Sequence, residues 1–119
     1  MAMDDNRFAM QTMDVYGVAK ELARRVHVAR IQDAELRDQA SRASKSVFLG
    51  LAEGLPNDLP GLRRRYFTQS RNSLCETVAA VDLAATLGAM SAEDAQAIQA
   101  LALRMCRMLT VLLTGKSNR

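Results

Sequence analysis

The chain has 119 residues, of which 49% are hydrophobic and 24% are charged, so it is long enough to bury one ordinary core and too short for a second domain. Aromatic residues make up only 4% and Trp is absent, whereas Ala, Leu, Val and Met are common, a composition that favours interlocking helices over a β-sandwich. The formal net charge of +3 is too small by itself to identify a nucleic-acid-binding protein.

Residues 1–12 show no hydrophobic periodicity and are predicted to form a flexible lead-in. The first helix is predicted over about residues 13–30, where apolar residues recur at spacings of three and four. Asp33 is suited to cap a second helix, predicted over residues 34–54. The following loop holds both prolines of the chain, and Asp58 within it is the expected cap of the next helix.

The third helix is predicted from about residue 59 to residue 87, with Gly88 placed to end it. Ser91 is expected to cap a fourth helix that reaches residue 114 and leaves a short basic tail, residues 115–119. The apolar face of the fourth helix is roughly 160° wide, more than one core needs, so we expect another surface to cover it. Helices of comparable length joined by short loops predict an all-α fold, an antiparallel up-down-up-down four-helix bundle over residues 13–114.

Cysteine usage and terminal composition indicate the compartment. Cys75 and Cys106 lie far apart, each inside an apolar helical pattern, so they are expected to be small core residues in a reducing cytosol. No apolar run is expected to be long enough to span a bilayer, and Asp4 and Asp5 stand where a signal peptide would need a basic segment. We therefore expect a cytoplasmic protein with no membrane segment.

A stripe of polar side chains runs beside the apolar seam of the second helix, and we interpret it as a specified interface. If the second and third helices are antiparallel, Arg42 faces Ser73 and Gln39 faces Glu76. Arg42, Gln39 and Glu76 are expected to cluster between the helices, because an Arg in an interface needs carboxylate and amide partners. The alternative is that these are ordinary solvated charges. The full predicted cluster is Gln39, Arg42, Ser46, Glu53, Ser73 and Glu76.

At these positions the chain resembles the bacterial four-helix bundle proteins encoded in intervening sequences of large-subunit ribosomal RNA. The second helix of that family ends in a run much like Gln-x-x-Arg-Ala-x-x-Ser-Ile-x-x-Asn-Ile-Ala-Glu-Gly. This chain matches the run at Gln39, Arg42, Ala43, Ser46, Ala52, Glu53 and Gly54. The family's third-helix pattern falls on Asn72, Ser73, Leu74, Glu76, Leu87 and Gly88. The chain departs from the family at Gly50, Phe48 and Asn72, where the family commonly has Asn, Pro and Gly.

The wider superfamily includes the accessory proteins of diversity-generating retroelements, which resemble this fold. Those relatives assemble as homopentamers and bind nucleic acid and a reverse transcriptase. The resemblance therefore implies a homopentameric ring for this chain, with RNA or single-stranded DNA and a reverse transcriptase or other protein as candidate partners. The expected subunit contacts are Phe48, Leu49, Leu55, Leu101 and Met108.

Arginines on the third and fourth helices are the candidate nucleic-acid contacts, since the third helix carries no acid from residue 59 to residue 72. They are Arg63, Arg64, Arg65, Arg71, Arg104 and Arg107. The first hypothesis is thus an oligomeric nucleic-acid-binding module without catalysis. The alternatives are that these arginines only solubilise the protein, and that it is a protein-interaction scaffold with no nucleic-acid role.

No pattern in the chain indicates an enzyme. His27 is the sole histidine and has no Cys or acidic cluster at ligand spacing, so we expect no metal site. Glu53 and Glu76 are not accompanied by the Glu-x-x-His motifs of bundles that hold two metals. We expect no catalytic residue and no cofactor, because neither a Gly-rich phosphate loop nor a nucleophile elbow is present.

Overall fold

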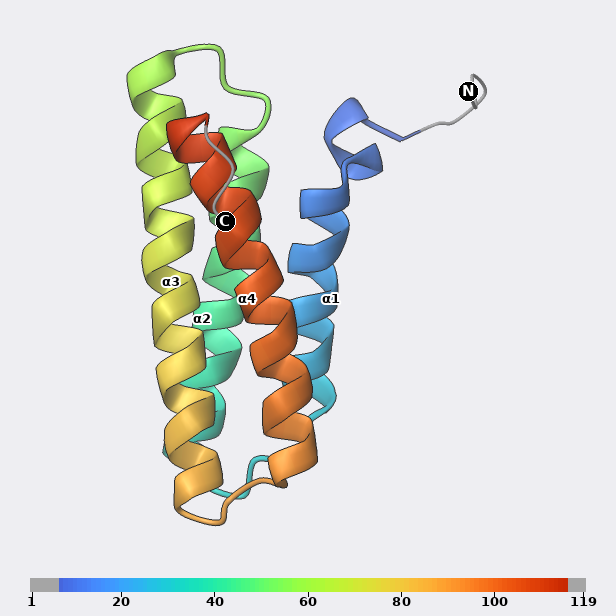
Figure 1. Cartoon of the computed structure of the whole chain (residues 1–119), viewed down its shortest axis with the longest axis vertical. Coiled ribbons are helices and arrows are strands. Elements are labelled where there is room, and N and C mark those ends of the chain that lie inside the picture. The colour runs from blue at the N-terminus through green and yellow to red at the C-terminus, as the bar shows by residue number, and fades with distance from the viewer. Residues whose placement is uncertain (1–6, 116–119) are drawn as a thin grey trace.

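The computed structural model describes residues 7–115, which form helices and no strands (Figure 1). The elements are the 3-10 helix η1 (Ala9–Thr12) and the α-helices α1 (Asp14–Val28), α2 (Ala34–Gly54), α3 (Pro60–Thr86) and α4 (Ala92–Thr114). The prediction of an all-helical fold with four α-helices is confirmed. The end of the expected lead-in differs from the prediction, since it forms η1. The rest of the lead-in, residues 1–6, and the tail after residue 115 lie outside the described residues.

Each α-helix packs against the next one along the chain, and α4 also packs against α1. The contact between α2 and α3 is the most extensive. Gln39 is hydrogen-bonded to Glu76, and Val47 further along α2 accepts a hydrogen bond from Ser70. Residue numbers therefore rise along α2 as they fall along α3, so these two helices run in opposite directions.

The core lies between the four α-helices and is made of aliphatic side chains with a single fully buried ring, Phe67. Leu22 from α1, Leu51 from α2 and Met105 from α4 have no exposed surface. Burial of one such side chain contributes about 1.5–3 kcal/mol. The hydrophobic pattern of the sequence thus predicts the inward faces of the helices.

The helix ends follow local chemistry at three of the four predicted positions. Asp33 Oδ1 accepts a hydrogen bond from Leu36 N–H at 2.9 Å, and Ser91 Oγ accepts one from Asp94 N–H at 3.1 Å. Gly88 has a φ of 74°, which lets the chain turn left-handed after α3. All three predicted capping roles are confirmed.

The predicted capping role of Asp58 is wrong. The residue before α3 is Leu59, which makes no side-chain cap, and its own N–H donates to Asn57 Oδ1 at 3.0 Å. Pro60 occupies the start of the helix, where its fixed φ suits the first turn and its missing N–H is not needed. The helix therefore begins at Pro60 without the help of Asp58.

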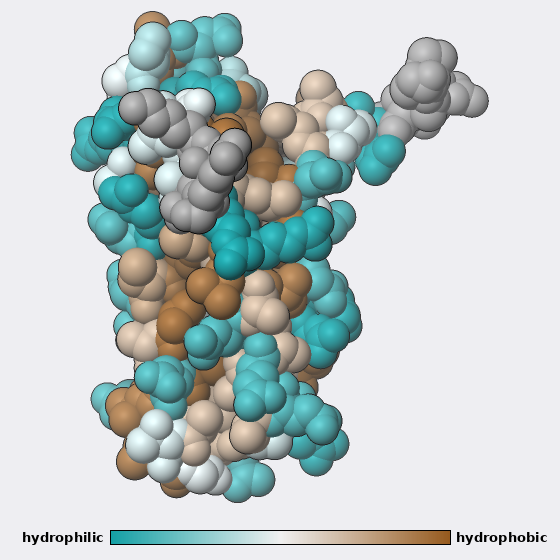
Figure 2. Space-filling view, in the orientation of Figure 1, coloured by the Kyte–Doolittle hydropathy of each residue, from teal (hydrophilic) through white to brown (hydrophobic). Residues whose placement is uncertain are grey.

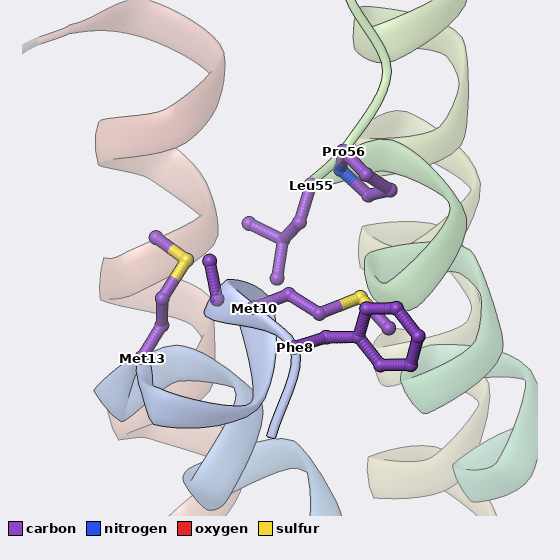
Figure 3. A pocket seen from close by; sticks show the side chains of 6 residues that line it. Phe8, Met10, Met13, Leu55 and Pro56 are labelled. Carbon is purple, nitrogen blue, oxygen red and sulfur yellow. The ribbon is translucent and has the colours of Figure 1, made fainter. Parts of the chain in front are cut away.

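The two ends of the bundle are built differently (Figure 1). At one end Gln32 N–H donates to Ala89 O at 2.7 Å, which joins the loop before α2 to the loop before α4. At the other end η1 and the end of α2 enclose an apolar hollow of about 480 Å³ (Figure 3). Its lining residues are Phe8, Ala9, Met10, Met13, Leu55 and Pro56.

The expectation that no helix is long and apolar enough to cross a membrane is wrong for α4. This helix has 23 residues and a stretch of mean hydropathy 1.4. Its apolar residues face both inward and outward: Met105 and Leu109 are in the core, whereas Leu103 and Val111 are 51% and 43% exposed. One such helix is weak evidence for a membrane protein, because mostly buried core helices of soluble proteins meet the same criteria of length and composition; 22% of this stretch of α4 is buried.

Candidate nucleic-acid interface

The polar stripe of α2 meets α3 through Gln39. Its Nε2 donates to Glu76 Oε2 at 3.4 Å, and its Oε1 accepts from Arg42 Nη2 at 3.2 Å. Gln39 thus links the two charged groups, which form no direct ion pair within residues 7–115. Arg42 and Glu76 are both exposed, which differs from the expectation of an Arg drawn into the interface.

Deeper in the same seam, small side chains let α2 and α3 approach closely. Ser73 Oγ donates to Ser46 Oγ at 2.9 Å, so Ser73 pairs with that hydroxyl rather than with Arg42. The fully buried Ser70 donates its hydroxyl to Val47 O at 2.7 Å. A Cβ atom on Gly50 would lie 3.3 Å from the Cβ of Ser70. The seam therefore serves helix packing.

Sequence reasoning missed the packing role of Gly50, Gly54 and Ser70. A signal was present, because Ser46, Gly50 and Gly54 recur every four residues and so lie on one face of α2. Such a row of small residues favours a close helix–helix contact. The departure from the family at Gly50 thus falls where α3 leaves little room for a side chain.

Arg63 is used within the fold. Its Nη1 donates to Leu55 O at 2.6 Å and to Gly54 O at 3.2 Å, and its guanidinium lies 4.9 Å from the centroid of the Phe67 ring. The last carbonyls of a helix have no partner within that helix. Arg63 supplies one for α2, so it is a structural residue.

Arg64 does the same for α4. Its Nη1 donates to Leu113 O at 2.9 Å, which ties the start of α3 to the end of α4. Arg64 is nonetheless exposed, and its other guanidinium N–H groups form no hydrogen bond in the described part of the chain. Two of the three consecutive arginines thus have structural roles.

Arg65 and Arg71 remain exposed on α3 and form no hydrogen bond or ion pair with any other residue in the described part of the chain. No Asp or Glu occurs from residue 59 to residue 75. This face holds a shallow hollow of about 480 Å³, lined by Gly61, Arg64, Arg65, Thr68, Gln69 and Asn72. The arrangement presents cations and neutral hydrogen-bonding groups with no competing carboxylate among them.

Arg104 and Arg107 are exposed on α4, also without a hydrogen bond or ion pair among residues 7–115. The Arg64–Leu113 bond sets the alignment of α3 and α4. Counting seven residues forward along α3 and seven residues back along α4 from that bond places Arg71 level with Cys106, the residue before Arg107 in the sequence. Both helices therefore contribute positive charge at the level of Arg71 and Arg107 along the bundle axis.

Glu53 lies on the exposed surface and forms no ion pair with the arginines of α3 in the described region. Among the described residues, the ion pair with the shortest N–O distance is on α1, where Arg24 Nη2 lies 2.7 Å from Glu21 Oε2. The hydrogen bonds from Arg24 lower the pKa of Glu21 from its ordinary value of 4.5 to about 2. This pair is separate from the α3 surface.

The residues expected at a subunit contact fall into two groups. Phe48 packs edge-on against Tyr16, with ring centroids 4.9 Å apart, and Leu55 is buried beside the apolar hollow. Leu101 and Met108 are half-buried against the core. Leu49, by contrast, is 56% exposed. Four of these residues therefore contribute to the fold of a single chain.

An apolar hollow of about 300 Å³ lies between α3 and α4. Figure 2 shows hydrophobic surface along this face, bordered by hydrophilic surface. Leu103, which is 51% exposed, lines the hollow together with Leu74, Val78 and Cys106. Sequence reasoning did not single out Leu103, because periodicity alone does not show which apolar residues of a wide face remain uncovered.

No group of three or more His, Cys, Asp or Glu side chains within residues 7–115 is placed to hold a metal ion. His27 is exposed at the end of α1. Cys75 is exposed and Cys106 is half-buried, so neither is the fully buried core residue that the sequence predicts.

Comparison with known protein families matches residues 11–111 to the family described as 23S rRNA-intervening sequence protein. No curated protein matches the chain. The matched span includes the polar seam between α2 and α3 and the arginines of α3 and α4, so the resemblance seen in the sequence is confirmed. The chain therefore belongs to the 23S rRNA-intervening sequence protein family.

Proposed function

We propose that this protein is a non-catalytic, oligomeric nucleic-acid-binding module, with RNA or single-stranded DNA as its ligand. The observation that carries the proposal is the exposed face of α3, where Arg65 and Arg71 have no protein partner in the described chain and no acid occurs from residue 59 to residue 75. Cations on such a surface bind phosphates and release the counterions condensed on the nucleic acid. Arg104 and Arg107 extend the positive surface onto α4.

The proposed subunit is an antiparallel up-down-up-down bundle, and the proposed assembly is a homopentameric ring. Exposed apolar side chains on two faces support self-association: Leu103 beside the α3–α4 hollow and Leu49 on α2. A ring also repeats the arginine surface and multiplies the net charge of +3. The solution mass tests the assembly by light scattering, and a stable monomer at all concentrations contradicts it.

We further propose that the protein is cytoplasmic and that neighbouring subunits, rather than lipid, cover the apolar side of α4. Exposed Arg104 and Arg107 on that helix support this placement, since charge in the middle of a membrane span is costly. Sedimentation of cell extract tests it. Recovery of the protein only in detergent-extracted membranes contradicts the proposal.

Binding of fluorescently labelled RNA and single-stranded DNA across a salt series tests the nucleic-acid role. Affinity is expected to fall steeply with salt. In a plot of log affinity against log salt concentration, the Arg65→Ala/Arg71→Ala variant is expected to reduce the slope by about 1 for each phosphate that the protein no longer neutralises. The matched control is Arg30→Ala/Lys45→Ala, which removes the same charge from other exposed positions. Absent binding at low salt, or equal losses of affinity in both variants, contradicts the proposal.

The second candidate function is a protein-interaction scaffold, with a reverse transcriptase or another protein as partner. The apolar hollow between α3 and α4 favours it, because exposed apolar surface of this kind is typical of protein contacts. The nucleic-acid titration separates the two candidates: a scaffold shows no salt-dependent binding, and its complexes dissociate on Leu103→Glu rather than on arginine substitution.

A further inference from the structure

We infer that the nucleic acid recognised by the α3 face is double-stranded RNA, held through its phosphates and 2′-hydroxyls and not through stacking of its bases. The inference rests on the proposed function and names its ligand class. It is carried by two independent features: where the aromatic side chains lie, and how the polar side chains are ordered around α3.

Proteins that hold single strands without sequence preference stack the bases on exposed aromatic side chains. This chain has two Tyr, three Phe and no Trp, and all of them lie within the described residues. Tyr16 is 9% exposed and Phe67 is 1% exposed, whereas Phe48 and Tyr66 are half-buried. Phe8, 75% exposed, precedes η1, and its ring extends toward the end of α2 at the apolar hollow (Figure 3). The arginine face of α3 therefore offers no stacking platform.

The charges on α3 form two edges of a neutral strip. Arg64 and Arg71 are two turns apart on one line of the helix, separated by about 10 Å along its axis. Arg65 is rotated from that line by about 100°. At about 100° per residue, Thr68 and Asn72 fall on the helix surface between Arg65 and the line through Arg64 and Arg71. Positive charge thus flanks an uncharged, hydrogen-bonding strip.

A groove of a duplex has the complementary arrangement, with one phosphate backbone along each side. A single strand has one backbone and requires only one row of cations. In A-form RNA the minor groove is wide and shallow and displays 2′-hydroxyls, and proteins recognise it by shape and by contacts to those hydroxyls and to phosphates. The α3 surface has arginines that match the two phosphate backbones and, between them, hydrogen-bonding side chains that match the 2′-hydroxyls.

The neutral side chains of this strip, and Gln69 just beyond Arg65 in the same hollow, are free to make such contacts. Thr68 is half-buried, Gln69 and Asn72 are exposed, and their side chains form no hydrogen bond within residues 7–115. Hydroxyl and amide groups both donate and accept hydrogen bonds, as a 2′-hydroxyl requires of its partner. Asp58 and Glu76 bound the acid-free stretch, which is about 24 Å long.

The test compares one sequence as single-stranded RNA, RNA duplex and DNA duplex in the same buffer by fluorescence anisotropy. The DNA duplex controls for charge density. We expect the RNA duplex to bind about tenfold tighter than single-stranded RNA and tighter than the DNA duplex. The Gln69→Ala/Asn72→Ala variant is expected to lose the preference for RNA over DNA duplex while keeping its affinity for DNA.

The outcomes separate this inference from the proposed function. Equal or tighter binding of single-stranded RNA overturns the duplex assignment and leaves nucleic-acid binding standing. Equal binding of the RNA and DNA duplexes, or a preference that survives Gln69→Ala/Asn72→Ala, overturns the 2′-hydroxyl contacts. Binding of none of the three at low salt overturns the proposed function and the inference together. Circular dichroism verifies that each variant is folded.

Discussion

Gly54 faces the ring of Phe67 so closely that a Cβ atom at position 54 would lie 2.6 Å from Phe67 Cε1. The ring is only 1% exposed and is also covered by the guanidinium of Arg63. It therefore has little free space into which it can move. The close packing of α2 and α3 depends on the missing side chain at Gly54.

We expect Gly54→Ala to lower the free energy of unfolding by about 1–3 kcal/mol, because the added methyl overpacks the contact with Phe67. Urea denaturation measures the change. The control is Gly17→Ala in α1, where nothing lies within 4 Å of the new Cβ and the substitution is expected to stabilise by about 0.5–1 kcal/mol. Equal stability of the two variants contradicts the overpacking argument.

Arg63 and Arg65 are two residues apart and are expected to behave oppositely. Arg63→Ala leaves the carbonyls of Gly54 and Leu55 without their charged donor, at a cost of about 1.5–3 kcal/mol in unfolding free energy. Arg65→Ala changes stability by less than about 0.5 kcal/mol, as is usual for exposed positions, and weakens RNA binding instead. Paired denaturation and binding measurements check this division, and a reversed pattern refutes it.

Local rules predicted much of the fold. The bounds of α2 agree with the prediction, and the caps Asp33 and Ser91 form because each needs only neighbours within the next few residues. Asp58 fails because a competing local rule, Pro at the first helical position, determines the start of α3. Such competition is not visible in the residue type alone.

The candidate site was less predictable because its roles depend on tertiary contacts. Nothing in the run from Arg63 to Arg65 shows that Arg64 reaches Leu113, which is distant in sequence. Phe48 is likewise a large apolar residue of the kind expected at a subunit interface, yet its ring packs on Tyr16 of its own chain. Residue type predicted the positive charge on α3, and only the arrangement of helices distinguishes the arginines that bond to the chain's own carbonyls from those that remain exposed.

The pair on α1 gives a prediction about pH. The pKa of Glu21 is lowered to about 2 by hydrogen bonds from Arg24 and, more weakly, Arg25. Because the folded pKa is below the ordinary value of 4.5, the pair favours folding above that pH and loses this contribution as the pH falls toward 2. An NMR titration of the Glu21 carboxyl carbon in Arg24→Ala should show the pKa rising toward 4.5.

Arg25→Ala provides the internal comparison for this titration. Its Nε lies 3.4 Å from the Glu21 carboxylate, farther than the Arg24 contacts, so its removal should raise the pKa of Glu21 less. A pKa of Glu21 that does not change in Arg24→Ala shows that the pair does not persist in solution.

Leu103 and Phe48 distinguish an assembly contact from a folding contact. Leu103→Glu places a charge in the exposed hollow between α3 and α4, so we expect a lower mass by light scattering with the helical content retained. Phe48→Glu removes the edge-on contact with Tyr16 and is expected to lower the unfolding temperature of the single chain. If Leu103→Glu and Leu49→Glu both leave the mass unchanged, neither face joins subunits.

The hydrogen bond from Gln32 N–H to Ala89 O joins two loops at one end of this bundle. Amides outside helices usually exchange rapidly with solvent, whereas a donor held between two loops is released only when both loops separate. The opposite end, where α3 begins, is tied by side chains instead, because Arg63 and Arg64 donate to carbonyls at the ends of α2 and α4. Removal of these arginine side chains therefore loosens one end of the bundle and leaves the bond between the two loops at the other end in place.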